Sequence, residues 1–404
     1  MASTLDALRP TARDGSAYDM PPPTFQEDLV SVERHTPGGE MLRRYWHPIA
    51  LVDEVKDLPI AVRVLGEDLV LFRTGDGFGL VHPRCAHRGT SLLYGRVEDR
   101  GIRCCYHGWL FDSQGRCLEQ PCEPGGRSPN CDKVRQPWYP TEARYGLVFA
   151  YLGPLDRKPP LPRYDVLEDV GPGERLHANG NSIGSGGPPR MPCNWLQTHE
   201  NVMDTWHVYV LHSTFTENQF NELMSIRPEI EWERTATGVV AISRRNLPDG
   251  RKRLRRVVEV VVPNVRIVAD PRLAVTGQAN NVAWTLPIDR TNTRIFTVFR
   301  LPVDVPAMEG AGPMYNGKRW SEMTAEEHQR FPGDFEAQVG QGDITYHSEE
   351  HLASSDRGVV MFRRALRQAI DDVASGSDVP GTAVGAQDPL HKVLAGNFIE
   401  EIAS

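Results

Sequence analysis

Long hydrophobic runs and an excess of basic residues are both missing from this sequence. No stretch approaches the ~18 consecutive apolar residues that a transmembrane helix requires, so we expect no membrane span. The formal net charge is -8 at pH 7, which argues against nucleic acid as a partner because phosphate binding favours a basic surface. The first residues, Met1 to Pro10, lack the basic and then apolar order of a secretion signal. These absences predict a cytoplasmic protein that binds neither membranes nor nucleic acid.

The cysteine count argues against a protein held together by disulfides. The chain contains seven cysteines, and an odd number in a long chain expected inside the cell does not suit a disulfide framework. Six of the seven lie between Cys85 and Cys131. Clustered thiols in a reducing compartment are better interpreted as metal ligands with some bystanders.

The 404 residues are enough for two packed domains, and they fall into three segments. Residues 1–42 look like an N-terminal arm, with three consecutive prolines and no clear periodicity. Residues 43–155 consist of short β-rich runs cut by turns, which predicts a small antiparallel β domain. A proline-rich linker at residues 154–162 leads into a second domain, residues 156–404, with helices laid on a mixed sheet. The expected fold class is α+β.

Local sequence assigns several elements within these domains. The predicted strands are Ile60–Leu65, Asp68–Phe72, Val257–Val262 and Val282–Leu286, with turns at Gly75-Asp76-Gly77 and Asp249-Gly250. The predicted helices are Asn194 to about Leu211, Val359–Val373 and a segment around Leu390–Ile402. Asn179–Pro189 is rich in Gly, Ser and Pro and is predicted to be a loop.

Two short segments each combine a thiol with an imidazole. Cys85-Ala86-His87 is followed, after sixteen residues, by Cys104-Cys105-Tyr106-His107. Thiolate and imidazole ligands suit either zinc or a two-iron cluster. In a zinc finger two cysteines come first and two histidines follow, whereas here each segment supplies one of each, which suits two metals held between two loops. Gly89 and Gly108 would let the backbone approach such a cluster. A structural zinc ribbon is the alternative.

A second candidate metal site lies in the predicted helix, where residues 194–212 read NWLQTHENVMDTWHVYVLH. The spacing of Glu200, Asp204 and His207 would place all three on one face of a helix. Acids and imidazoles are costly to bury without a metal or partner charges. His212 is displaced by ~140° from His207 on an ideal helix, so both rings can reach one metal only if the helix ends or bulges between them. The alternative is an amphipathic helix with satisfied core histidines.

Together the two patterns resemble those of the Rieske non-haem iron oxygenases. The segments CAHRG and CCYHGWLF resemble the Rieske motif, and the similarity runs from about Met41 to about Val373, including EEHLASSDRGVVMFRR. In a Rieske centre one iron takes two cysteines and the other takes two histidines. The resemblance therefore implies a [2Fe-2S] cluster, and its expected ligands are Cys85, His87, Cys104 and His107, with Cys105 a bystander. It also implies a Rieske domain followed by a helix-grip-like catalytic domain.

The same resemblance implies a mononuclear Fe(II) held by two histidines and one carboxylate. The histidines would be His207 and His212, and the family takes its acid from far downstream. The matching segment here contains Asp334, Glu336 and Asp343. The Gly-x-Ile spacing after the acid selects Asp334, and the other two are its competitors.

Two more residues acquire roles from the family. Asp204 resembles the carboxylate that links a cluster histidine of one subunit to an iron histidine of its neighbour, here His107 to His207. Such a bridge would fix both imidazole tautomers and shorten the electron route. It implies a ring of subunits, with a homotrimer as the basic unit. Asn201 matches an asparagine near the open side of the iron.

The resemblance implies the O2-using oxygenase component of a multicomponent enzyme. Because the chain contains no Rossmann glycine fingerprint after a strand, NAD(P)H is expected to act through a separate reductase or ferredoxin. The overall spacing resembles the phthalate dioxygenase-like branch, and the MFRRALRQAI ending resembles the 5,5'-dehydrodivanillate O-demethylases. This implies monooxygenation, in particular O-demethylation, of an aromatic acid or aryl ether. The alternatives are ring cis-dihydroxylation and, outside the enzymes, a zinc-stapled binding or electron-carrier protein.

Basic residues crowd the predicted hairpin in this acidic chain. They are Arg244, Arg245, Arg251, Lys252, Arg253, Arg255 and Arg256. Most such runs are solvated faces. The sharper hypotheses are a docking surface for an acidic reductase and a carboxylate clamp for an aromatic acid.

Overall fold

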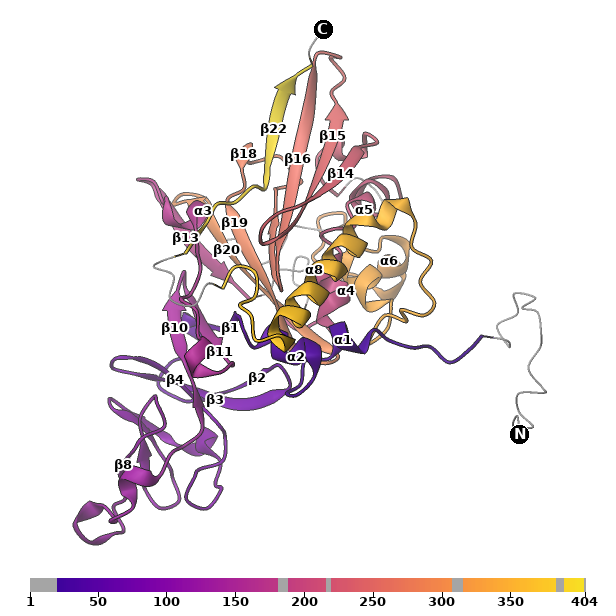
Figure 1. Cartoon of the computed structure of the whole chain (residues 1–404). Coiled ribbons are helices and arrows are strands. Elements are labelled where there is room, and N and C mark those ends of the chain that lie inside the picture. Colours follow the sequence, from indigo (N-terminus) through magenta and orange to yellow (C-terminus); the bar gives the residue numbers. More distant parts are fainter. Residues whose placement is uncertain (1–19, 181–187, 216–218, 307–314, 383–388, 403–404) are drawn as a thin grey trace, which may run out of the picture.

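The structure is a computed structural model that describes residues 20–180, 188–215, 219–306, 315–382 and 389–402. Figure 1 shows an all-β part that extends to the loops around β8, and a larger part in which helices lie against a long sheet. This architecture confirms the α+β fold class. The predicted loop at Asn179–Pro189 lies mostly outside the described residues. No helix within those residues is both long and apolar enough to cross a membrane.

Three antiparallel sheets make up the all-β part. The first joins β1 (Trp46–Leu51), β11 (Leu147–Tyr151) and β10 (Thr141–Arg144). The second joins β2 (Ile60–Val64), β3 (Glu67–Thr74), β4 (Gly77–Val81) and β9 (Trp138–Tyr139). The third joins β5 (Arg96–Glu98), β6 (Gly101–Arg103), β7 (Leu110–Phe111) and β8 (Cys117–Glu119). The predicted strands at Ile60–Leu65 and Asp68–Phe72 are confirmed, and Thr74 pairs with Gly77 across the predicted turn.

Part of the expected N-terminal arm belongs to the core instead. Residues 27–42 contain α1 (Glu27–Val30) and α2 (Pro37–Leu42), and Thr36 caps α2 by accepting a hydrogen bond from the Gly39 N–H. Four hydrophobic side chains of these helices are fully buried, namely Leu29, Val30, Met41 and Leu42. Residues 27–42 of the expected arm therefore contribute to the hydrophobic core. Short helices without strong periodicity become stable here because they pack against a helix from the other end of the chain.

A nine-stranded sheet forms the framework of the larger part. Its order is β13 (Glu174–Asn179), β20 (Asn292–Pro302), β19 (Asn281–Asp289), β17 (Val265–Val268), β16 (Lys252–Val261), β15 (Gly238–Asn246) and β14 (Glu229–Arg234). Two more strands, β18 (Gly277–Gln278) and β22 (Gly396–Glu401), pair with each other, and β22 also pairs with β16. The predicted hairpin between β15 and β16 is confirmed, and Gly250 has the positive φ of 66° that its turn requires.

Helix α8 (Arg357–Ala374) crosses this sheet and meets α1, α2 and α4 (Trp195–Glu200) (Figure 1). Its buried residues include Val359, Phe362, Leu366 and Ala369, whose spacing of three and four residues forms one apolar stripe. This confirms the helix predicted at Val359–Val373. Shorter helices are α3 (Asp165–Glu168), α6 (Ala325–Arg330) and α7 (Asp334–Val339).

The helix predicted around Leu390–Ile402 is wrong. This segment forms β21 (Leu390–His391), which pairs with β12 (Arg163–Tyr164), and then β22. Along β22 each residue from Gly396 to Glu401 lies opposite one from Val257 to Lys252. The strand forms because β16 offers a free edge beyond the end of β17, and that pairing outweighs the local helical preference.

Candidate functional site

The loops that carry Cys85 and Cys104 have the same backbone hydrogen bonds. In each loop the cysteine N–H donates to the carbonyl five residues later, and a glycine N–H donates back to the cysteine carbonyl. These bonds are Cys85 N to Thr90 O (2.9 Å), Gly89 N to Cys85 O (2.8 Å), Cys104 N to Trp109 O (2.9 Å) and Gly108 N to Cys104 O (3.0 Å). The two loops are equivalent turns, and Cys104, not Cys105, takes the place that Cys85 has in the first.

The side chains of these loops divide into inner thiols and outer imidazoles. Cys85 and Cys104 are 4% and 3% exposed, and burial raises the pKa of the Cys85 thiol to about 11. The His87 and His107 rings lie 4.6 Å apart, both partly exposed. Trp109 stacks on His87 at 4.3 Å. Two facing loops, each with one thiol and one imidazole, fit a two-iron cluster that takes its cysteines from the inner side and its histidines from the outer side.

Gln136 supports the first loop, a role that the sequence did not indicate. Its side-chain carbonyl accepts the Ala86 N–H (2.8 Å), and its amide donates to the carbonyls of His82 (2.7 Å) and Arg84 (3.0 Å). Gln136 is fully buried. Gln136 therefore supplies hydrogen-bond partners that a neighbouring strand would otherwise provide to the backbone of this loop.

The predicted helix from Asn194 to Leu211 is interrupted. Helix α4 ends at Glu200, turns occupy residues 201–205, α5 (Trp206–Tyr209) follows, and residues 210–215 form a π-helix. The expectation that Glu200, Asp204 and His207 share one helical face is therefore wrong. The bulge expected between the two histidines is present as the π-helix. Its wider turn brings the ring of His212 back to the side of His207.

Arg363 determines where Glu200 points. The buried guanidinium of Arg363 donates to both carboxylate oxygens of Glu200 (2.6 and 2.7 Å) and to both of Glu350 (2.6 and 2.8 Å). Glu200 therefore fixes the end of α4 to α8 and is unavailable to a metal. Nothing in the local sequence indicated this partner, which lies on a helix near the other end of the chain.

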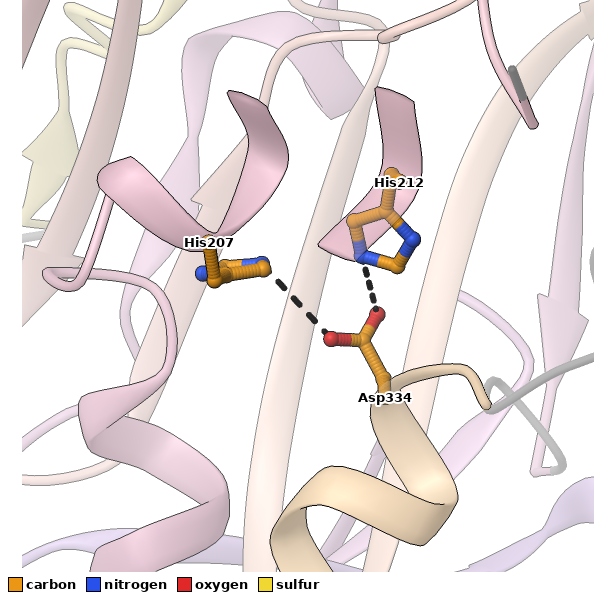
Figure 2. A group of neighbouring side chains, drawn as sticks. All are labelled: His207, His212 and Asp334. Carbon is orange, nitrogen blue, oxygen red and sulfur yellow. Dashed lines mark ion pairs between the residues drawn. The ribbon is translucent and has the colours of Figure 1, made fainter. Parts of the chain in front are cut away.

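Three side chains converge where the π-helix meets the start of α7. His207 Nε2 lies 3.6 Å from one carboxylate oxygen of Asp334, and His212 Nε2 lies 3.4 Å from the other (Figure 2). One ligand atom from each of the three lies within 4.8 Å of the others. Of the competitors, Glu336 accepts a bond from the Trp320 indole (2.7 Å) and lies 2.8 Å from His328. Asp343 is not in the group either.

Both histidines present the same nitrogen to this space. His207 Nδ1 is bonded to the backbone carbonyl of Asp204, and His212 Nδ1 is bonded to the Gln219 side-chain oxygen at 2.7 Å. Because both acceptors are oxygens, each Nδ1 carries the proton and each Nε2 carries a lone pair. Among the described residues, none donates a hydrogen bond to the buried His212 Nε2. Two imidazole lone pairs and one carboxylate fit a divalent iron with open positions.

The charges agree with this donor set. Burial alone would raise the pKa of Asp334, but the nearby His212 and His207 outweigh it and hold that pKa well below its usual value. For His212, burial alone would lower the pKa, but the Asp334 carboxylate outweighs it, and the pKa is raised. His207, for which burial dominates, has a lowered pKa. The ionised Asp334 carboxylate beside the neutral His207 imidazole is the state that binds a metal cation, and a bound cation would displace the proton that the raised pKa of His212 favours.

Asn201 and Asp204 border the three converging side chains. The Asn201 amide donates to Asp334 Oδ1 (3.1 Å) and lies 3.4 Å from His207 Nε2. The Asp204 carboxylate lies 4.0 Å from His207 Nδ1, and 42% of its side chain is exposed. In Figure 1 the β8 region, which belongs to the sheet beside the Cys and His loops, lies far from α5, in the other part of the molecule.

Comparisons with known proteins identify the family. The Rieske [2Fe-2S] domain matches residues 45–136. The phenoxybenzoate dioxygenase subunit alpha of Ectopseudomonas oleovorans is 47% identical over 95% of this chain and 94% of its own length. This chain belongs to the Rieske non-haem iron oxygenases. It is an oxygenase α subunit of that family, and the oxygenases of the family use a Rieske [2Fe-2S] cluster and a mononuclear Fe(II).

Other Rieske oxygenase subunits are similar over most of the chain. The oxygenase subunit of tert-butanol monooxygenase / tert-amyl alcohol desaturase from Aquincola tertiaricarbonis is 38% identical over 83% of this chain and 74% of its own. The 5,5'-dehydrodivanillate O-demethylase oxygenase subunit of a Sphingobium species is 32% identical over 93% and 89%. The solved structure of Pseudomonas putida NdmA with caffeine shares the fold, with a TM-score of 0.61, 19% identity and coverage of 86% and 98%.

Proposed function

We propose that this Rieske oxygenase α subunit oxygenates an aromatic carboxylic acid and cleaves an aryl ether bond. The observation that carries the proposal is the convergence of His207, His212 and Asp334 in a chain that also has a Rieske domain. In the proposed division, residues 43–155 form the cluster domain and residues 156–404 form the catalytic domain.

The proposed ligands follow from the donor atoms described above. Cys85, His87, Cys104 and His107 would hold the cluster, and His207, His212 and Asp334 would hold Fe(II). When bound, these groups supply O2 activation driven by single electrons. Asn201 would orient the Asp334 carboxylate through its 3.1 Å hydrogen bond. Gln219 and the Asp204 carbonyl would keep both Nε2 lone pairs on the metal side.

The proposed assembly is a ring of subunits, with a homotrimer as its unit. Asp204 supports it, because its carboxylate is exposed beside His207 and could accept a hydrogen bond from His107 of another copy. Two electrons per turnover would come from NAD(P)H through a separate reductase or ferredoxin in the cytoplasm. A stable, fully active monomer would contradict this assembly.

The relatives' names support the substrate class. The relative with 47% identity is named for phenoxybenzoate, which contains both an aryl ether and a carboxylate, and another is named for O-demethylation of dehydrodivanillate. In demethylation, one oxygen atom of O2 enters the methyl C–H bond and the other leaves as water, with two electrons and two protons consumed. The hemiacetal then releases formaldehyde and a phenol.

The test is product analysis with purified chain, reductase and NADH. Methoxylated benzoates should release formaldehyde, and phenoxybenzoates should release a phenol, in amounts that match O2 consumption. Ring cis-dihydroxylation is the second candidate, because the same 47% relative is named a dioxygenase. A stable diol without formaldehyde or phenol would establish that alternative instead. An enzyme that oxygenates only substrates without a carboxylate would overturn the proposed class.

A further inference from the structure

The basic run at the β15–β16 hairpin divides between two faces of the sheet. Successive side chains of a strand alternate between faces, so Arg253 and Arg255 lie opposite Arg256. Both Arg253 and Arg255 pair with Glu400 on β22. Arg244 lies directly opposite Arg255, on the same face, and likewise has an acidic partner, Glu231. The face of Arg253 and Arg255 therefore carries a network of ion pairs. Lys252, at the start of β16 on the other face, pairs with Glu401.

Arg245 and Arg256 lie on the other face and are buried without an acidic partner. Their exposed fractions are 2% and 3%. Arg245 donates to the Ile226 carbonyl (3.1 Å) and the Ser243 hydroxyl (3.0 Å), and Arg256 donates to the Ala269 carbonyl (2.8 Å). Across the described residues, neither guanidinium forms an ion pair with a carboxylate, and the buried Nε of Arg256 has no acceptor.

These arginines lie beneath the segment that carries the iron ligands. Leu254, which lies directly opposite Arg245 in the β15–β16 register, packs with Val208 of α5 and with Phe220. The Phe220 ring in turn lies 4.6 Å from the His212 ring. Arg256 follows Leu254 by two residues on β16, so its side chain lies on the same face of the sheet. The two guanidinium groups are thus buried beside the candidate iron site.

The burial of two positive charges with no anion nearby is costly in free energy. Burial lowers the pKa of Arg245 to about 10 and that of Arg256 to about 9, and the two charges repel each other. Asp270 is the acid that acts on Arg256, but its carboxylate already accepts backbone N–H groups of Arg272, Ala274 and Val275. Among the residues that the structure describes, no carboxylate therefore serves as a dedicated counter-ion for this positive charge.

We infer that Arg245 and Arg256 bind the carboxylate of the aromatic substrate and so orient its ring toward the iron. The inference rests on the aromatic-acid function proposed above and names its anchoring residues. Guanidinium groups suit this task because they donate paired hydrogen bonds to a carboxylate. Their location inside the domain, together with the acidic partners of the other face, favours a substrate anchor over a reductase-docking surface.

Calorimetric titration of the holoenzyme with 3-phenoxybenzoate, without reductase, tests the inference. Arg256→Gln and Arg245→Gln should each raise the dissociation constant by about 10- to 100-fold, the range expected for hydrogen bonds to a charged group. Binding of the neutral 3-phenoxybenzamide should change by less than about 3-fold. Arg255→Gln is the matched control, since it removes a neighbouring arginine from the opposite face, and should leave both constants nearly unchanged.

Thermal unfolding separates anchoring from a structural role. Because the two arginines have no acidic partner among the described residues, their substitution removes only hydrogen bonds to neutral oxygens and should lower the melting temperature by no more than a few degrees. Unchanged acid binding in both variants, or equal losses for acid and amide, overturns the inference. Product analysis tests the proposed reaction separately. Binding that depends on the arginines, without ether cleavage, would contradict the proposed reaction and support the proposed anchor. Ether cleavage by Arg256→Gln with wild-type affinity would contradict the anchor and support the reaction.

Discussion

The two candidate metal regions are built in different ways. The proposed cluster ligands lie within one short stretch, Cys85 to His107, on two turns with the same hydrogen bonds. The proposed iron ligands come from an interrupted helix and from the start of α7, far downstream. The first region can be recognised from a local motif because each loop forms its own geometry. The second exists only after the sheet and its helices have packed, so its ligand set depends on distant parts of the chain.

The largest expected effect comes from removing the distant ligand. Asp334→Ala should abolish mononuclear iron binding and lower turnover by at least about 100-fold, since even supporting residues of a metal site have effects of this size. The cluster, held by its own local loops, should keep its visible absorption and acid-labile sulfide. Iron and sulfide analysis measures both sites. Asp343→Asn is the control and should behave like wild type; loss of the cluster in Asp334→Ala would contradict the independence of the two regions.

A smaller effect is expected where the two regions must communicate. Asp204→Asn retains the side-chain shape and removes the charge, so both metals should stay bound. Turnover should fall by between about 10- and 100-fold, with slower reoxidation of the reduced cluster by O2 in the presence of substrate. Stopped-flow absorption of the cluster follows this step. Wild-type reoxidation in the variant would exclude Asp204 from the electron route.

The supporting residues of the iron site should matter less than its ligands. Gln219→Ala removes the acceptor that holds His212 Nδ1, so Nε2 is no longer fixed as the lone-pair nitrogen. We expect iron affinity to fall by about 10-fold, measured by competition with a chelator. Gln219→Glu keeps an acceptor oxygen and should preserve affinity. If the alanine variant binds iron as tightly as the wild type, then packing against Phe220 alone orients the His212 ring.

The smallest expected effect distinguishes the adjacent cysteines. Cys105 is exposed and outside the repeated turn, so Cys105→Ser should change cluster content by less than about 10%, within the near-neutral range of surface substitutions. Cys104→Ser should lose the cluster. Absorption spectra of the two purified variants compare them directly, and a colourless Cys105→Ser protein would reverse the choice of ligand.

The same contrast explains what could be predicted from the sequence. Strands, turns and the cluster loops follow from short-range patterns, so β2, β3 and the turn at Gly75–Gly77 form where expected. The convergence on Asp334 was expected from family resemblance, and local periodicity alone could not have supplied it. Wrong predictions share one cause, which is tertiary contact: β22 pairs with β16, and Glu200 turns to Arg363. The two faces of the basic hairpin likewise become distinct only when β22 supplies Glu400.

Hydroxyl groups of the π-helix that carries His212 form hydrogen bonds with backbone carbonyls of the same segment. The Ser213 hydroxyl donates to the Val208 carbonyl (3.1 Å), and the Thr214 hydroxyl donates to the Val210 carbonyl (3.4 Å). These bonds occupy carbonyls that a regular helix would satisfy with backbone amides, so the chain's own side chains help to hold the bend. We therefore expect the bend to persist when the metal is removed. Added Fe(II) should then restore the loaded protein without refolding of this segment.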